Sequence, residues 1–254
     1  MYKDLLFEIK GSTAIITINK PGSLNALNKN IINELSEALT AIDTDERIRV
    51  VILTGSGEKA FVAGADIKEF ADFDSKQAEN LAREGQDKLF NKVENFSRPI
   101  IAAVNGFALG GGLELAMSCH MRFASTNARL GLPEVTLGLI PGYGGTQRLP
   151  QLVGKGIANE IIFSAEMVSA ERAYEIGLVN RVYEPTELLE KTVEFAEKIA
   201  RNSPLAISRA IQAVNLSNSI TGYDKEIHFF GELFDLQDKQ EGVAAFLEKR
   251  KPNF

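Results

Sequence analysis

Two glutamates stand in apolar surroundings where a carboxylate could carry out proton transfer. Glu114 is flanked by Leu113 and the apolar run 115–117, and Glu134 follows Pro133 twenty residues later. Burial among apolar side chains disfavours the charged form, which raises the pKa of a carboxyl toward the range useful for acid–base catalysis. Two such groups could work as an acid and a base. Taken alone, each residue is more often ordinary: Glu114 a first-turn helix glutamate favoured by the dipole, and Glu134 an acid in a surface turn.

A run of three glycines, 110–112, separates the apolar segment 100–104 from the helix expected around Glu114. Glycine lets the backbone approach a ligand closely, and a helix start presents unpaired N–H groups that can stabilise a developing oxyanion. A tight strand-to-helix crossing that needs small residues explains the run about as well. Leu113 stands where a P-loop requires Ser or Thr, and no G-x-G-x-x-G pattern surrounds Gly110 or Gly142, which disfavours nucleotide hydrolysis and dinucleotide binding.

The composition removes several other kinds of chemistry. Among 254 residues there are two His, one Cys and no Trp, so an intrachain disulfide is impossible and a zinc site is not expected. The formal net charge of -6 argues against nucleic acid as the main partner. No apolar run reaches the ~20 residues of a membrane span, and no signal peptide precedes the first strand-like segment, so we expect a cytoplasmic protein. Any catalysis is left to carboxylates and backbone amides.

The elements that must position these groups indicate an α/β fold. Apolar or alternating runs at 5–9, 14–18, 50–53 and 100–104 predict strands, the last two covered on both faces. Asn28 can cap a helix whose apolar residues recur from Ile31 to Ile42, and a polar helix is expected over 77–94. Three glycine-containing loops, 60–68, 105–114 and 131–146, each follow or close a strand-like run. Such loops are where α/β folds bind ligands.

The hydrophobic pattern of the sequence changes beyond about Thr186. Amphipathic patterns predict helices over 188–200, 205–214, 221–236 and 242–250. This helical region could cover the core, mediate oligomerisation or close over a ligand. No linker composition separates it, so we divide the chain into a core, 1–185, and a C-terminal helical region, 186–254, within one domain unit.

Several motifs, in order and at characteristic spacing, resemble those of the enoyl-CoA hydratase (crotonase) family. They are Ala63-Gly64-Ala65-Asp66, the stretch 102–116 with its three glycines and Glu114, Pro133-Glu134, and Pro141-Gly142-Tyr143-Gly144-Gly145-Thr146-Gln147-Arg148-Leu149. The resemblance extends to the segment 246–251 and thus spans nearly the whole chain. It implies a crotonase (ClpP-like) fold of repeated ββα units, with the C-terminal helices forming a homotrimer or homohexamer.

The resemblance also implies a hydro-lyase reaction in fatty-acid β-oxidation. The backbone N–H groups of Ala65 and Gly111 would hold a thioester carbonyl and stabilise its enolate. Glu114 would act as the base while hydroxyl adds to C3, and Glu134 would deliver the proton to C2, so that a trans-2-enoyl-CoA becomes a 3-hydroxyacyl-CoA. No metal and no cofactor is implied, since coenzyme A is part of the substrate.

Further positions that match the family are expected to bind the CoA thioester. These are Ala63, Ala65, Asp66, Ile67, Lys68, Gly111, Phe230, Phe246 and Lys249, the last three reaching the site from the C-terminal helices, often of a neighbouring subunit. Candidate walls of the acyl pocket are Phe61, Phe70, Phe73 and Tyr143, each of which could equally be an ordinary core or surface aromatic. Leu132 departs from the family, because many short-chain hydratases have Gln there to orient the second glutamate.

Three alternatives stay open. Within the fold, the chain could be an enoyl-CoA isomerase or a specialised branched acyl-CoA hydratase. From another class, it could bind CoA or RNA without catalysis, although the acidic net charge disfavours RNA. The sequence does not choose an acyl chain length, a physiological direction, or a trimer over a hexamer.

Overall fold

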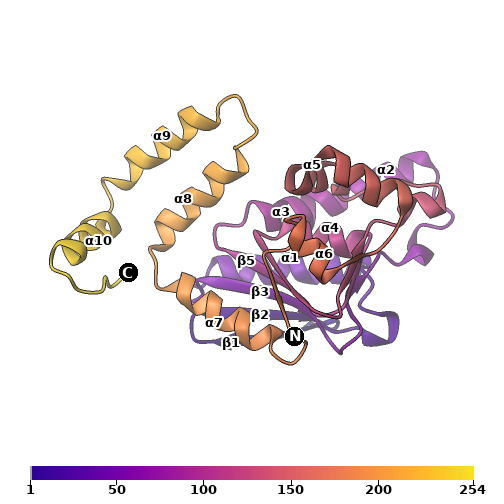
Figure 1. Cartoon of the computed structure of the whole chain (residues 1–254), viewed down its shortest axis with the longest axis horizontal. Coiled ribbons are helices and arrows are strands. Elements are labelled where there is room, and N and C mark those ends of the chain that lie inside the picture. The colour runs from indigo at the N-terminus through magenta and orange to yellow at the C-terminus, as the bar shows by residue number, and fades with distance from the viewer. Residues whose placement is uncertain (1) are drawn as a thin grey trace.

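The computed structural model describes residues 2–254 and contains two β-sheets wrapped by helices (Figure 1). The larger sheet has the strand order β1-β2-β3-β5-β7-β10. Its strands are β1 (Leu5–Lys10), β2 (Thr13–Ile18), β3 (Val50–Gly55), β5 (Ile100–Val104), β7 (Met121–Ser125) and β10 (Arg181–Tyr183). The β1–β2 pair is antiparallel and the other pairs are parallel. This confirms the expected early hairpin and the two continuous apolar strands.

Both faces of the central strands β3 and β5 are covered, as their unbroken apolar runs predict. Alternate residues point to opposite sides: Val51 and Leu53 belong to the main core, whereas Ile52 and Ile101 pack under helix α7 (Leu188–Ala200). Every residue of β3 and β5 is buried. The sheet is therefore a rigid base for the loops that leave its strands.

A smaller sheet has the order β4-β6-β8-β9. Its strands are β4 (Ala60–Ala63), β6 (Phe107–Leu109), β8 (Arg129–Gly131) and β9 (Val168–Ser169). The pairs β3/β4, β5/β6 and β7/β8 each place one strand in the larger sheet and the next in the smaller one, and helices follow each pair. The chain thus repeats a ββα unit, which confirms the expected fold class.

Helices complete each repeat. They are α1 (Lys29–Asp43), α2 (Ser75–Gly85), the π-helical turn η3 (Gln86–Phe90), α3 (Asn91–Glu94), α4 (Gly111–Ser118), α5 (Gly145–Ser164) and α6 (Ala170–Glu175), with short 3-10 turns η1 (Pro21–Ser23), η2 (Ile67–Glu69) and η4 (Glu134–Leu137). Asn28 caps α1 by accepting a hydrogen bond from the N–H of Ile31, as expected. The helix expected over 77–94 is α2, η3 and α3 in succession.

The C-terminal part is helical, as expected, and its first helix makes the most extensive contact with the core. Helix α7 packs across the larger sheet, while α8 (Pro204–Asn215), α9 (Gly222–Leu233) and α10 (Gln237–Leu247) extend to one side of it (Figure 1). Helix α9 buries none of its residues, and α10 buries only Ala245. These helices therefore present apolar side chains to the outside.

Within residues 2–254, no helix is long and apolar enough to cross a membrane.

Candidate active site

The glycines before Glu114 are required by the backbone. Gly110 has φ +49°, a conformation that side chains rarely tolerate, and turns the chain from β6 into α4. At Gly112, a Cβ would lie only 1.9 Å from the carbonyl oxygen of Val62, because α4 packs directly on β4. Close helix–strand packing thus explains part of the glycine run. The same turn leaves the first N–H groups of α4 without intrahelical acceptors.

Glu114 is buried in the first turn of α4, with 1% of its surface exposed. Its Oε1 accepts hydrogen bonds from the backbone N–H groups of Tyr143, at 2.8 Å, and Gly145, at 2.7 Å. Burial raises the pKa of Glu114 to about 7, against the lowering effect of these two hydrogen bonds and of the nearby Arg148. The carboxyl can therefore both gain and lose a proton near neutral pH.

Glu134 begins the short turn η4 and reaches the same region. A Cβ on Gly110 would lie 2.9 Å from Glu134 Oε1, which places this carboxylate beside the turn that starts α4. Among residues 2–254, the buried Oε2 atom of Glu134 has no hydrogen-bond partner. Burial raises the pKa of Glu134, and its negative charge adds to the raised pKa of Glu114. The structure thus brings the two predicted glutamates together at one site.

Two backbone amides lie next to these carboxylates. A Cβ on Gly111 would be 3.8 Å from the backbone nitrogen of Ala65, so the two peptide groups are neighbours. A parallel bridge between Leu27 and Ala65 holds the second loop in place. Within residues 2–254, neither N–H donates to a turn, loop or capping hydrogen bond. Two adjacent, unengaged donors are what an oxyanion hole requires.

Sequence reasoning missed Arg148, which supports the loop around Glu114. Its guanidinium is buried on α5, pairs with Glu94 at 2.6 Å, and donates from Nη1 to the carbonyl oxygen of Tyr143 at 2.9 Å. The same Tyr143 peptide unit supplies an N–H to Glu114. Arg148 therefore fixes one of the two peptide groups that donate to the Glu114 carboxylate. An arginine just before the buried Leu149, in a helix that starts with glycines, was the available signal.

The candidate CoA residues fall into two groups. Ala63 ends β4, and the chain continues from Ala65 through Asp66, Ile67 and Lys68 into η2, with the nitrogen of Ala65 next to Gly111. Asp66 also caps η2 by accepting from the N–H of Lys68 at 3.3 Å. This first group therefore lies beside the candidate site, and its contact with CoA stays a prediction.

The second group lies away from the site within one copy of the chain. Phe230 is exposed on α9, Phe246 is 82% exposed on α10, and Lys249 follows α10, and all three belong to the helices that extend from the core (Figure 1). A role for them at the site needs a neighbouring copy. It stays a prediction.

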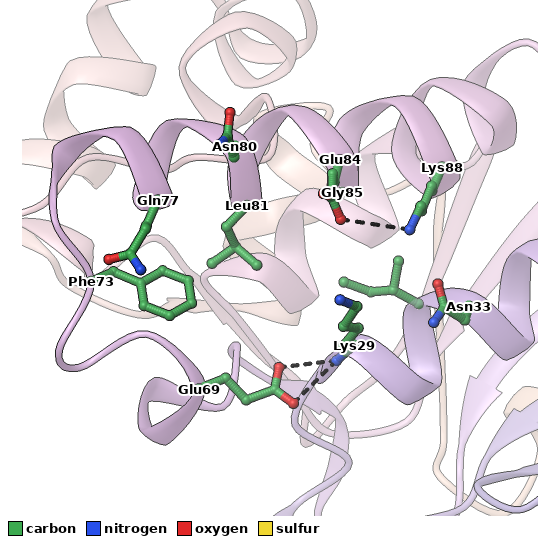
Figure 2. A pocket seen from close by; sticks show the side chains of 11 residues that line it. Lys29, Asn33, Glu69, Phe73, Gln77, Asn80, Leu81, Glu84, Gly85 and Lys88 are labelled. Carbon is green, nitrogen blue, oxygen red and sulfur yellow. Dashed lines mark hydrogen bonds and ion pairs between the residues drawn. The ribbon is translucent and has the colours of Figure 1, made fainter.

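The four aromatic candidates for walls of the acyl pocket have different surroundings. Phe61 is fully buried in the main core, whereas Phe73 lines a cavity of about 400 Å³ between α1 and α2 (Figure 2). Phe70 closes the C-terminal end of η2. Tyr143 is buried and stacks on Phe90, with ring centroids 4.6 Å apart. Phe61 is thus a core residue and not a pocket wall.

The remaining residues with reactive side chains have structural surroundings. Cys119 is a free, buried thiol whose pKa burial raises to about 12. His120 accepts from the N–H of Ile100 through Nδ1, and burial lowers its pKa to about 4. His228 pairs with Glu232 on the surface. Among residues 2–254, no group of three or more His, Cys, Asp or Glu side chains could hold a metal ion.

Leu132 lies near Glu114 and is fully buried. A Cβ on Gly145 would be 3.0 Å from Glu114 Oε1 and 3.1 Å from Leu132 Cδ1, so the leucine contributes to the apolar surroundings of the loop that holds Glu114.

Comparison with known proteins places this geometry in context. The sequence profile described as enoyl-CoA hydratase/isomerase matches residues 8–254. The short-chain-enoyl-CoA hydratase of Clostridium acetobutylicum is 46% identical over 251 residues, covering 98% of this chain and 96% of that protein. The crotonyl-CoA hydratase of Syntrophomonas wolfei is 45% identical over 257 residues, covering 100% of this chain and 98% of that protein.

Solved structures agree with the sequence comparison. The crystal structure of an enoyl-CoA hydratase from Bacillus anthracis superposes with a TM-score of 0.94 at 41% identity, covering 99% of both chains. These similarities extend over the whole chain and include every element that forms the site. The chain belongs to the enoyl-CoA hydratase/isomerase family.

Proposed function

We propose that the protein is an enoyl-CoA hydratase that adds water across the C2=C3 double bond of a trans-2-enoyl-CoA to give a 3-hydroxyacyl-CoA. One observation carries the mechanism: two carboxyls with raised pKa values, Glu114 and Glu134, lie beside the unengaged N–H groups of Ala65 and Gly111. Relatives named short-chain-enoyl-CoA hydratase and crotonyl-CoA hydratase support the reaction.

The amides act on the charge that develops during addition. As hydroxyl bonds to C3, the electrons of the double bond move toward the thioester carbonyl, whose oxygen becomes negative. The N–H groups of Ala65 and Gly111 stabilise that oxygen more in the transition state than in the ground state. Removal of one such donor costs about 3 kcal/mol in well-studied oxyanion holes.

The two glutamates move the protons. Glu114, as a carboxylate, takes a proton from water while the hydroxyl bonds to C3, and protonated Glu134 gives its proton to C2. Proton exchange from Glu114 to Glu134 through solvent then restores the starting state. The pKa of about 7 at Glu114 suits a base at neutral pH, and burial also raises the pKa of Glu134.

This reaction transfers only a proton and a hydroxyl group, so the proposal includes no metal and no redox cofactor. Dialysis of the protein against a chelator is therefore expected to leave turnover unchanged. The buried free thiol of Cys119 agrees with a reducing compartment, and a cytoplasmic location remains a prediction.

We also propose that residues 186–254 mediate assembly as a homotrimer or homohexamer. Exposed apolar side chains gather on the extended helices: Leu205, Val214, Ile220, Tyr223, Ile227, Phe230, Phe234, Val243, Phe246 and Leu247. A face this apolar favours burial against another copy. The neighbouring copy could then bring Phe230, Phe246 and Lys249 to the CoA group, with Lys68 offering a further positive charge.

The direct test follows the loss of enoyl absorbance with crotonyl-CoA and identifies the product by chromatography. We expect 3-hydroxybutyryl-CoA from the native protein and at least ~100-fold slower turnover from Glu114→Gln. A product with a shifted double bond and no hydroxyl would identify an isomerase. Folded protein without turnover on short, medium and branched enoyl-CoAs would refute the proposal.

A further inference from the structure

The side chain of Tyr143 has no part in the proton transfers, yet its place next to the site is tightly fixed. The N–H of residue 143 donates to Glu114, and its carbonyl oxygen accepts from Arg148. Its ring stacks almost parallel on Phe90, with an interplanar angle of 13°. The backbone and one ring face are therefore held by separate partners.

The two edges of the Tyr143 ring meet different parts of the molecule. On one edge, Cδ2 would lie 3.5 Å from a Cβ on Gly111, which carries an oxyanion amide. On the other edge, Cε1 would lie only 2.4 Å from a Cβ on Gly85, so the ring fits there because residue 85 has no side chain. The ring thus fills the space between the thioester site and Gly85.

Gly85 also lines the cavity of about 400 Å³ between α1 and α2. The apolar side chains of Ile32, Phe73 and Leu81 line the same cavity. Its volume falls in the range of about 300–1,000 Å³ that is usual for small-molecule pockets. Gly85 therefore borders both the Tyr143 ring and this cavity, whose apolar side chains stand among polar ones.

Charged groups surround this apolar lining. The N–H of Lys29 donates to the carboxylate of Glu69, and Lys88 pairs with Glu84 at 3.6 Å (Figure 2). Burial, Glu114 and then Glu69 raise the pKa of Tyr143 to about 12. Its ring meets Gly111 at one edge and Gly85 at the other, so it extends from the backbone amide of Gly111 to a residue that lines the cavity.

We infer that Tyr143 limits the acyl chain length by separating the thioester site from the cavity between α1 and α2. This inference rests on the proposed hydratase function. A four-carbon enoyl group ends before the ring, whereas the further methylenes of a longer chain need the volume that the ring occupies. Without the ring, the apolar cavity past Gly85 can receive them.

The test compares kcat/KM for trans-2-octenoyl-CoA and crotonyl-CoA in the native protein, Tyr143→Phe and Tyr143→Ala. We expect the native protein to favour crotonyl-CoA, and Tyr143→Phe to keep the octenoyl/crotonyl ratio of kcat/KM within about twofold. Tyr143→Ala should raise this ratio at least ~10-fold, because a single methylene changes kcat/KM by about 10- to 200-fold. If Tyr143 had a purely structural role, its replacement would lower kcat/KM for both substrates by the same factor. If Tyr143→Ala does not fold, Tyr143→Leu retains a packing side chain and serves the same comparison.

A second change locates the added methylenes. Leu81→Trp in the Tyr143→Ala background fills the cavity, so the ratio is expected to return toward the native value. An unchanged ratio in Tyr143→Ala, equal native use of both substrates, or no effect of Leu81→Trp would each overturn the inference. No native turnover of crotonyl-CoA would instead refute the proposed function, and the inference with it.

Discussion

Replacing Glu114 by Gln is expected to stabilise the protein at alkaline pH while removing its activity. The glutamine oxygen can still accept from the N–H groups of Tyr143 and Gly145, which now bond to Glu114 Oε1. Side-chain size is nearly unchanged. The substitution therefore removes the ionisation of a buried carboxyl and leaves its hydrogen bonds and packing in place.

The magnitude follows from the raised pKa. The folded protein shifts the pKa of Glu114 from an ordinary 4.5 to about 7, so between these values the folded state binds the proton more tightly than the unfolded state. The free energy of unfolding contributed by this group is thus greatest at low pH and is lost as the pH rises through about 7. The full loss is about 3 kcal/mol, and about 2.5 kcal/mol of it falls between about pH 5 and pH 8.

Denaturant unfolding curves at about pH 5 and pH 8 measure this effect. Contributions from other titrating groups are nearly the same in both proteins, so the advantage of Glu114→Gln should grow by about 2.5 kcal/mol across this range. Both proteins are compared at one concentration, because assembly shifts apparent stability. Glu58→Gln, a change at an exposed loop position, is the matched control and should show no such pH dependence.

The activity of Glu114→Gln should fall, although its free energy of unfolding at alkaline pH rises. Turnover of crotonyl-CoA by Glu114→Gln should fall at least ~100-fold, since an amide cannot accept the proton of water. An advantage in unfolding free energy that does not change with pH would refute the raised pKa of Glu114. Turnover within a few-fold of native would refute the role of Glu114 as the base.

Other changes test the rest of the site. Glu134→Gln should lower kcat at least ~100-fold in the crotonyl-CoA assay, because C2 then lacks its proton donor; a near-native rate would exclude that role. Arg148→Met should lower the free energy of unfolding by about 2–4 kcal/mol, because it leaves Glu94 unpaired. The same change should shift the lower inflection of the pH–rate profile to higher pH, because a positive charge near Glu114 is lost. Gly112→Ala should sharply lower the melting temperature, since its Cβ would overlap the Val62 carbonyl oxygen, whereas Gly156→Ala, with open space around its Cβ, should not.

The main elements could be predicted because their signals are local. The runs 50–53 and 100–104 are continuously apolar, which matches strands covered on both faces, and Asn28 marks the start of α1. The short strands β4, β6 and β8 have three or four residues each, too few for a periodic pattern. Their place in the smaller sheet follows from the resemblance to the crotonase family and from the strand order of the structure.

The site could be predicted only in part. Glu114 and Glu134 have a common signal, a carboxyl in an apolar stretch, but their proximity depends on how Gly110 turns the chain into α4. Arg148 was not predicted, because its role comes from a contact with the Tyr143 carbonyl oxygen that residue spacing in the sequence does not show. The separation of the site from the cavity by one aromatic ring is likewise a property of packing.

The C-terminal helices show a further limit of sequence reasoning. Their amphipathic patterns correctly predict helices, yet the patterns do not say what covers the apolar faces. Helix α7 meets the larger sheet, whereas α9 buries no residue within the chain. The pattern does not show what covers such a face, so assembly stays a proposal.

Opposing effects balance at Glu114 and leave its pKa in a useful range. Burial raises the pKa of the carboxyl, and a neutral acid cannot serve as the base for water. Two backbone N–H donors and the charge of Arg148 oppose this effect and hold the pKa at about 7. Arg148 acts twice, because it also fixes the Tyr143 peptide that supplies one donor. The loop 141–145 therefore contributes to the pKa of Glu114, the proposed base, and it also carries the ring that we propose limits the acyl chain.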